Sequence, residues 1–108
     1  MDRPEFGLTL AVRIDLLTTA QGGRIHPVGS GYRPICLIPV TDGPDAMVGL
    51  CELSLDNPLA PGETGAGRLK FARAVSELVR SLVRVGSRFA LAEGNHTIGH
   101  AEVREITP

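Results

Sequence analysis

The chain has 108 residues, of which 43% are hydrophobic, and a formal net charge of −1 at pH 7. This length suits one hydrophobic core, so we treat residues 1–108 as a single domain. The near-neutral charge argues against general nucleic-acid binding. No apolar run approaches the roughly 18 residues that a membrane-spanning helix needs.

The N-terminus and the cysteines together predict a cytoplasmic protein. The first ten residues, MDRPEFGLTL, do not place a basic segment before an apolar stretch, so we expect no secretory signal. Cys36 and Cys51 each lie within an apolar run. We expect buried free thiols in a reducing compartment, with a disulfide as the less favoured alternative.

Period-two hydrophobicity predicts a long first strand. From Phe6 to Leu16 every second residue is apolar, which places one face of the strand on the core. A loop rich in glycine and proline, GGRIHPVGSGYRP, follows at Gly22–Pro34. Residues 35–40 then predict a short buried strand, and Pro39 near its end indicates an edge position or a bulge.

Four further segments show alternation or apolar runs, with turn-forming residues between them. Gly94 and Asn95 separate the last two segments and supply the positive φ angles of a β-hairpin turn. Six strands in a chain of this length predict a small all-β barrel or sandwich. The four segments are residues 47–55, 69–75, 88–93 and 97–106.

One segment has the periodicity of a helix. Apolar residues follow the i, i+3, i+4 pattern from Val75 to Val83, while Arg80 and Arg84 fall on the other side. Gly86 is a suitable stop signal. We therefore expect one short amphipathic helix near residues 76–85.

Basic side chains are concentrated in one part of the chain. Residues 64–92 carry six basic and one acidic side chain, whereas residues 1–63 carry four basic and eight acidic ones. A local basic face that includes Arg68, Arg80 and Arg84 is therefore one interpretation. An ordinary solvated surface without a partner is the favoured one.

The sequence contains no pattern that predicts catalysis or metal binding. Gly62–Leu69, GETGAGRL, has the glycine spacing of a P-loop, but Arg68 and Leu69 stand where Lys and Ser/Thr are needed for phosphates and Mg²⁺. His96 and His100 share one face of a strand at about 13 Å, which does not suit a common metal ion. No serine lies in a Gly-x-Ser-x-Gly motif. We expect no enzymatic activity, nucleotide, metal or cofactor.

Two motifs in combination resemble the C-terminal β-barrel domain (domain III) of bacterial elongation factor Tu. The first is GGR, six residues and GYRP at Gly22–Pro34, and the second is RFALAEGNHTIGHAEV at Arg88–Val103. The order of strands, Pro-Gly connection and closing hairpin also matches, so the resemblance covers about residues 6–106. It implies a six-stranded antiparallel Greek-key β-barrel, and we expect a stand-alone version of that domain.

The resemblance also implies a function. In that family the GTPase chemistry belongs to a separate nucleotide-binding domain, of which this sequence has no counterpart. The barrel contacts the T-stem backbone of aminoacyl-tRNA, packs against the GTPase domain and offers a surface to the nucleotide-exchange partner. We expect a non-enzymatic translation-factor-like module that contacts tRNA, other RNA or a translation-related protein. The alternative is a protein-interaction or regulatory module, including a homodimer, without RNA binding.

Candidate binding residues follow from the motifs and from the basic segment. Several positions depart from the family pattern, chiefly Ile25–Ser30 within the loop and Ile35 after it, so tRNA binding cannot simply be inherited. A structural clamp that ties the loop to the barrel wall is the alternative role for Tyr32 and Arg33. The candidates for contact with RNA or a partner are Arg24, Tyr32, Arg33, Glu93, Gly94, Arg68, Arg80 and Arg84.

Overall fold

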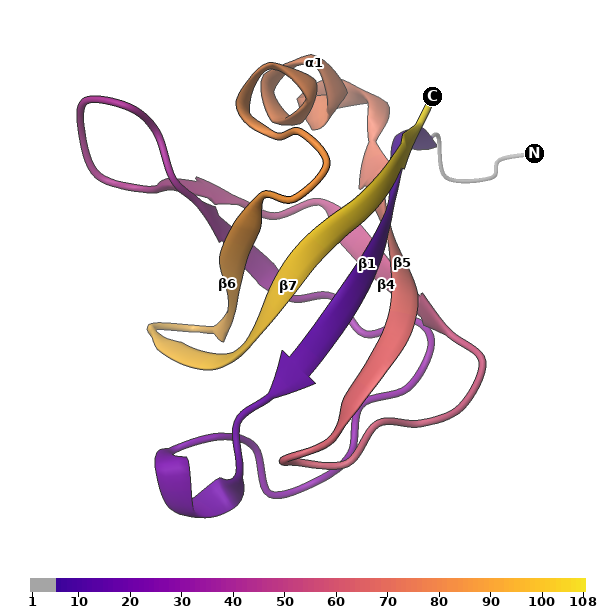
Figure 1. Ribbon diagram of the computed structural model, residues 1–108, viewed down its shortest axis with the longest axis vertical. Helices are drawn as coiled ribbons and strands as arrows, with labels where there is room; N and C mark the ends of the chain where they lie inside the picture. The colour runs from indigo at the N-terminus through magenta and orange to yellow at the C-terminus, as the bar shows by residue number, and fades with distance from the viewer. Residues whose placement is uncertain (1–5) are drawn as a thin grey trace.

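A curled antiparallel sheet forms the body of the molecule (Figure 1). The computed structural model describes residues 6–108, and within them seven strands follow the order β3-β2-β6-β7-β1-β5-β4. The all-β fold class with one short α-helix, predicted from the sequence, is confirmed. The strands are β1 (Phe6–Leu16), β2 (Ile35–Ile38), β3 (Ala46–Val48), β4 (Cys51–Leu55), β5 (Thr64–Ala72), β6 (Arg88–Glu93) and β7 (His96–Thr107).

The long strand β1 is central, and its alternation has the expected cause. It pairs with β5 along one side and with β7 along the other. Leu8, Leu10, Val12 and Ile14 face the core with at most 2% of their surface exposed. Because burying a side chain of this size contributes about 1.5–3 kcal/mol, β1 supplies a large share of the hydrophobic stabilisation.

One predicted strand is divided in two, which accounts for the seventh strand. We expected a single strand over residues 47–55, whereas β3 and β4 are separated by Gly49 and Leu50. Leu50 has a positive φ of 56°, which interrupts the extended backbone and turns the chain. As a result β3 pairs with β2 while β4 pairs with β5, at opposite ends of the sheet.

A short segment of the β1–β2 loop bridges these two ends of the curled sheet. The Gly31 N–H donates to the Leu53 carbonyl at 2.8 Å, and the Leu53 N–H donates to the Tyr32 carbonyl at 2.8 Å. Because Tyr32 lies shortly before β2, backbone hydrogen bonding passes from β4 towards β2 across this junction. We call this junction, between residues 31–36 and 50–53, the seam.

The helix α1 (Arg73–Leu82) begins earlier than the predicted helix near residues 76–85. It follows β5 directly, and Ser76 and Val79 are the buried residues of this helix. A Cβ atom added to Gly7 would lie 2.5 Å from Ser76 Oγ. A glycine at this point of β1 therefore lets the helix lie close against the strand.

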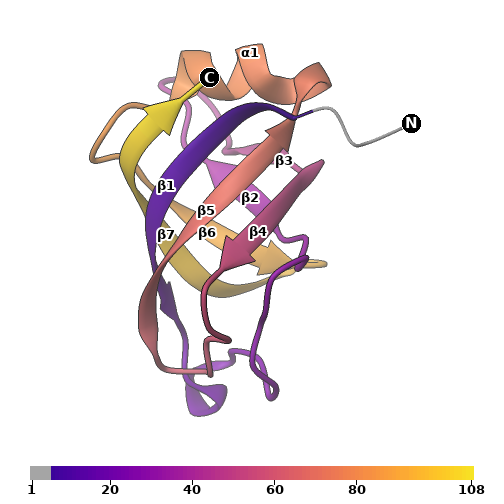
Figure 2. The ribbon, with the colours of Figure 1, turned by 90° about the vertical axis from the view of Figure 1, so that its right-hand side faces the viewer.

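The chain also leaves the helix earlier than the apolar periodicity indicates. Val83 is extended, the Gly86 N–H donates to the Val103 carbonyl at 2.8 Å, and the Val103 N–H donates to the Ser87 carbonyl at 2.8 Å. These bonds attach the segment to β7. The helix thus lies across one end of the sheet, whereas the 3-10 helix η1 (Thr19–Gln21) and the β1–β2 loop lie at the other (Figure 2).

We expect Gly99→Ala to destabilise the fold. Gly99 of β7 pairs with Leu16 and Leu91, and an added Cβ would lie 2.7 Å from the Asp15 carbonyl oxygen. Because backbone atoms must shift, the free energy of unfolding in urea should fall by about 1–3 kcal/mol. Gly29→Ala is the matched control, since nothing lies within 4 Å of its added Cβ, and its change should stay below about 0.5 kcal/mol. Equal losses for the two variants would contradict this packing.

Candidate binding surface

The β1–β2 loop begins with a capped turn. The Gln21 N–H donates to Thr18 Oγ1 at 3.1 Å, and the Thr18 N–H donates to Gln21 Oε1 at 2.9 Å, which forms a capping box around η1. Gly22 ends the turn with a φ of 93°, a conformation that favours glycine. The first glycine of the GGR motif therefore has a structural role.

Three of the predicted binding residues meet at the end of the sheet opposite α1. Arg24 forms an ion pair with Glu93, and the Tyr32 hydroxyl donates to Glu93 Oε2 at 2.5 Å. The Arg24 guanidinium also lies 5.1 Å from the centroid of the Tyr32 ring, within cation–π range. We call Arg24, Tyr32 and Glu93 the loop clamp, because they tie the loop to the end of β6.

The backbone around Arg24 is held as well. Arg24 Nε donates to the His26 carbonyl at 3.0 Å, and Thr19 Oγ1 donates to the Arg24 carbonyl at 2.7 Å. Partial burial raises the pKa of Tyr32, and the positive charge of Arg24 acts in the opposite direction. Tyr32 therefore stays a neutral hydrogen-bond donor at neutral pH.

The middle of the loop is anchored to the connection between β4 and β5. Val28 is buried and exchanges two backbone hydrogen bonds of 2.9 Å with Leu59. Ser30 Oγ donates to the Leu55 carbonyl at 2.8 Å and accepts from the Leu55 N–H at 2.8 Å. Of the residues that depart from the elongation-factor pattern, Val28 and Ser30 are thus held against the sheet, whereas residues 25–27 are exposed.

Arg33 lies apart from the loop clamp. Its side chain is 76% exposed, and Nη2 lies 3.8 Å from Glu52 Oε1, a weak surface ion pair. A groove of about 330 Å³ runs beside it along the seam. We call it the seam groove, and its lining includes Phe6, Arg33, Pro34, Leu50, Cys51 and Glu52.

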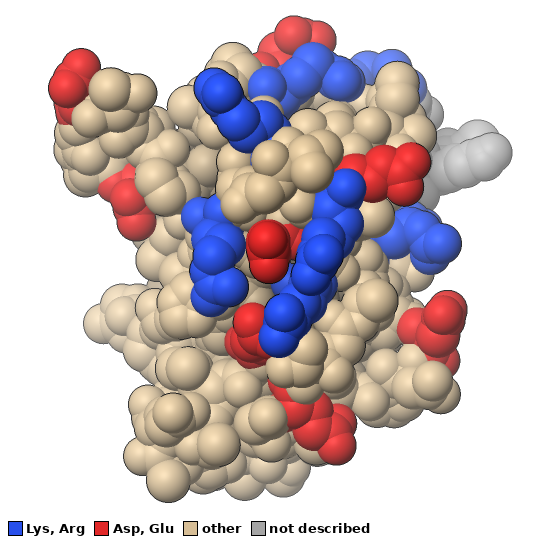
Figure 3. All heavy atoms as spheres, in the orientation of Figure 1, with Lys and Arg blue, Asp and Glu red and all other residues tan. Residues whose placement is uncertain are grey.

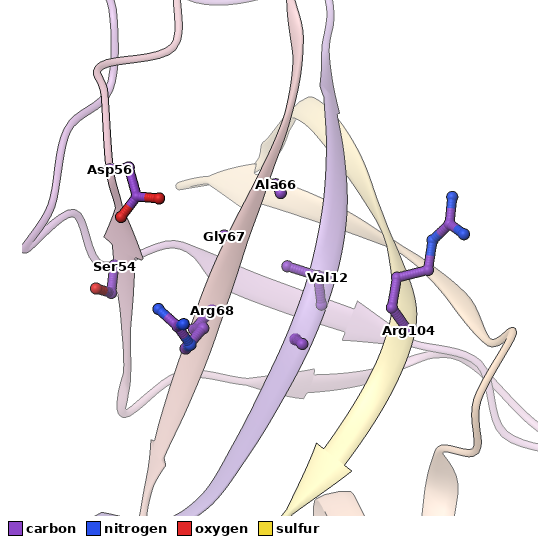
Figure 4. A pocket seen from close by; sticks show the side chains of 8 residues that line it. Val12, Ser54, Asp56, Ala66, Gly67, Arg68 and Arg104 are labelled. Carbon is purple, nitrogen blue, oxygen red and sulfur yellow. The ribbon is translucent and has the colours of Figure 1, made fainter.

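Arg68 borders a hollow on the outer wall of the sheet, about 210 Å³ in volume. Figure 4 shows Arg68 on β5 and Arg104 on β7, on either side of Val12 in β1. Ala66 and Gly67 are among the small residues that line it. Within residues 6–108, Arg68 forms no ion pair. We call this feature the wall hollow; it is lined by Ala11, Val12, Ser54, Asp56, Ala66, Gly67, Arg68 and Arg104.

Charges of both signs alternate on this wall (Figure 3). Asp15 Oδ1 lies 3.3 Å from Arg13 Nε, and Asp15 Oδ2 lies 3.9 Å from Arg88 Nη1. Glu102 Oε1 lies 3.9 Å from Arg104 Nη2. The hydrogen bond that Thr64 Oγ1 donates at 2.7 Å is the main cause of a lowered pKa for Asp15. Arg13 and Arg88 lower that pKa further, against the opposing effect of burial.

The structure separates the remaining predicted residues. Gly94 forms the β6–β7 turn with a φ of 55° beside the loop clamp, whereas the positive φ expected at Asn95 is wrong, because among residues 6–108 only Leu50 has a positive φ besides glycines. Arg80 belongs to α1 at the other end of the sheet, where Nη2 donates to the Gly7 carbonyl at 3.4 Å, and Arg84 follows the helix. The arginines of the basic segment are therefore distributed over the wall and the helix, and no single face collects them.

Sequence reasoning missed Arg13 and Arg104 as members of the wall. Alternation placed Arg13 on the outer face of its strand, but it did not say which residues lie beside it. The register that sets Arg13 opposite Glu102, and Arg88 opposite the same residue, arises from strand pairing across the whole chain. A local sequence pattern does not predict such a register.

Residues 6–108 contain no group of three His, Cys, Asp or Glu side chains that could hold a metal ion. Over the same range, no helix has the length and apolar character needed to cross a membrane. The polar groups of the loop clamp are paired with one another, whereas Arg68 on the wall forms no ion pair within residues 6–108.

No protein-family model matches the chain. It is 31% identical over 96 residues to elongation factor Tu 2 of Streptomyces avermitilis, a match that covers 89% of this chain. The matched part is 22% of that protein, so the chain spans about a fifth of the relative's length. With the β-rich fold, this match confirms that the chain resembles the C-terminal β-barrel domain of elongation factor Tu.

We expect Glu93→Ala to loosen the loop clamp. The substitution leaves the Arg24 guanidinium and the Tyr32 hydroxyl without their shared acceptor. Urea unfolding should show a loss of about 1–3 kcal/mol, with faster amide exchange across the loop. Glu105→Ala is the control, because Glu105 is exposed, and its loss should stay within about 0.5 kcal/mol. If Glu93→Ala cost no more than the control, the clamp would not stabilise the fold.

We expect Thr64→Val to raise the pKa of Asp15 towards its ordinary value of 3.8, because the main cause of the lowered pKa is lost. In the natural chain, the stabilisation from a lowered pKa is present above 3.8 and is lost as pH falls through the folded-state pKa. As pH falls from 3.8 through the folded-state pKa of Asp15, the free energy of unfolding should therefore fall less for the variant than for the natural chain. An NMR titration of the Asp15 carboxyl group tests this directly, and an unchanged pKa would contradict the assignment.

Proposed function

We propose that the chain is a non-enzymatic, translation-factor-like β-barrel module that binds an RNA backbone through its outer wall. The similarity to an elongation factor Tu supports the translation-related part of this proposal. The observation that carries the RNA-binding part is the placement of Arg68 and Arg104 on either side of the wall hollow. In this proposal the protein acts in the cytoplasm.

The chemistry of the wall hollow suits phosphate groups. A guanidinium group can donate two parallel hydrogen bonds to one phosphate, which a lysine ammonium cannot do. Small residues in the lining, such as Ala66 and Gly67 beside Arg68 on β5, leave room for a sugar-phosphate backbone to approach. Arg13 borders an adjoining hollow of about 370 Å³ and offers a third cation.

The acidic side chains on the wall set the strength of the interaction. Asp56 lines the hollow itself, and Glu102 faces Arg104 at 3.9 Å. A phosphate that binds the arginines therefore comes close to these carboxylates, and the repulsion between like charges weakens the interaction. We propose a weak, sequence-independent contact that falls steeply with salt concentration.

The other predicted residues have different roles in this proposal. The loop clamp and Gly94 shape the end of the barrel, where a bound RNA continues beyond the wall. Arg33 supplies an exposed cation at the rim of the seam groove. Arg80 and Arg84 provide only long-range attraction, because they lie at the helix end.

The second candidate function is a protein-docking module without RNA binding, either as a homodimer or as a regulator of a translation protein. The seam groove favours it, because Leu50, which lines the groove, is 66% exposed. Exposed apolar side chains at a groove are typical of a protein interface. This candidate predicts that Leu50→Ser abolishes partner binding while any RNA binding persists.

Gel retardation of tRNA tests the RNA-binding proposal. We expect the natural chain to retard tRNA at low ionic strength, with a double-logarithmic salt slope that Arg68→Ala/Arg104→Ala reduces by about 1.4–1.8, because two phosphate contacts are lost. Arg80→Ala/Arg84→Ala removes the same charge from the helix end and is the matched control. It should leave the slope nearly unchanged.

Three results would contradict or redirect the proposal. The absence of retardation by the natural chain at low salt would overturn RNA binding and leave the protein-docking candidate. Equal effects of the two double variants would show attraction by net charge without a wall site. A larger effect of Arg24→Ala, after unfolding experiments show the variant to be folded, would move the contact to the loop end.

A further inference from the structure

The two cysteines face each other across the seam. Cys36 lies in β2 and Cys51 begins β4, two strands that are not neighbours in the sheet. Their Sγ atoms are 3.8 Å apart, although the residues are 15 positions apart in the chain. The bridging hydrogen bonds of Gly31 and Tyr32 to Leu53 bring these two strands together.

The two thiols differ in their access to small molecules. Cys36 is fully buried, whereas Cys51 is 3% exposed and lines the seam groove of about 330 Å³. The Cys51 thiol also lies 3.4 Å from the Pro34 carbonyl, to which it donates a hydrogen bond. A molecule of the size of hydrogen peroxide that enters the groove therefore reaches Cys51 before it reaches Cys36.

The two thiols also differ in acidity. A hydrogen bond from the Cys36 thiol lowers the pKa of Cys51, and the same contact together with burial raises the pKa of Cys36 well above its usual range. Because the thiolate is the nucleophile in thiol oxidation, the more acidic and more accessible sulfur is the one that reacts first. Access and acidity thus both favour Cys51.

We propose that Cys36 and Cys51 form a reversible intramolecular disulfide across the seam when the protein meets a peroxide. The Cys51 thiolate attacks one peroxide oxygen, so that an S–O bond forms, the O–O bond breaks and the departing hydroxide takes up a proton as water. Cys36 then attacks the Cys51 sulfur; an S–S bond forms, the S–O bond breaks and, with the Cys36 proton, the second water leaves. Two thiols thereby supply the two electrons that reduce one peroxide.

The contact between the sulfur atoms must shorten for the bond to form. The Sγ atoms must approach from 3.8 Å to about 2.05 Å. The new bond would cross-link strands that have only hydrogen bonds and packing between them at this point. It would also close a chain loop of about 15 residues, which restricts the unfolded state.

The experiment uses the reduced 108-residue chain and hydrogen peroxide. After oxidation and alkylation under native conditions, peptide mass spectrometry should find Cys36 joined to Cys51 within one monomeric chain. The midpoint of thermal unfolding should rise by roughly 10 °C, and dithiothreitol should reverse the rise. The disulfide map of the natural chain is decisive even if a variant folds poorly.

Two single variants separate the steps. In Cys36→Ala, peroxide should leave a sulfenic acid on Cys51 that dimedone traps, without any rise in the unfolding midpoint. In Cys51→Ala, Cys36 should react at least about tenfold more slowly than Cys51 does in the other variant, because Cys36 is fully buried whereas Cys51 lines the seam groove.

Other outcomes overturn the proposal. If both thiols remain fully alkylatable on denaturation after hours in peroxide, the pair is only a packing contact between two small apolar side chains. Sulfinic acid at Cys51 in the natural chain, or a disulfide between two chains, would show that Cys36 does not reach Cys51. A salt-dependent tRNA interaction is a separate property, so these results do not depend on RNA binding.

Discussion

The hydrogen bonds between Leu53 and the backbone of Gly31 and Tyr32 hold the curled sheet closed. The sheet begins at β3 and ends at β4, and these strands are consecutive in the chain. The turn at Leu50 sends them to opposite ends, so another segment must bridge the gap. The last part of the β1–β2 loop does so, and the seam groove, the cysteine contact and the position of Arg33 all result from this closure.

The glycine- and proline-rich β1–β2 loop has a structural role along most of its length. Its first part caps η1, its middle part pairs with Leu59, and its last part closes the seam. The loop clamp then fixes it to β6 through Glu93, which accepts from both Arg24 and Tyr32. The polar groups of Arg24, Tyr32 and Glu93 are thus engaged inside the fold, and for this reason we place the proposed RNA contact on the outer wall, at Arg68.

Much of this fold follows from local patterns, and the rest depends on long-range pairing. The alternation of β1, the hairpin at Gly94 and the presence of a helix could be predicted from periodicity and turn chemistry. The break at Leu50 could not, because a leucine with positive φ has no sequence signal. The wall arginines were likewise missed, since strand register places Arg13 beside Glu102 and the sequence does not reveal that register. For Tyr32 the sequence allowed a structural clamp or a binding role, and the structure shows its hydrogen bond to Glu93 and its ring contact with Arg24.

Native-state amide exchange at the seam tests the central claim, that the signature loop closes the sheet. We expect the Gly31 and Leu53 amide protons to exchange as slowly as those of Leu10 and Val12 in β1, because all four then open only when the sheet opens. Exchange of Gly31 and Leu53 as fast as that of the exposed Gly43 would contradict the claim, since it would show the seam to be open in solution while the rest of the sheet persists.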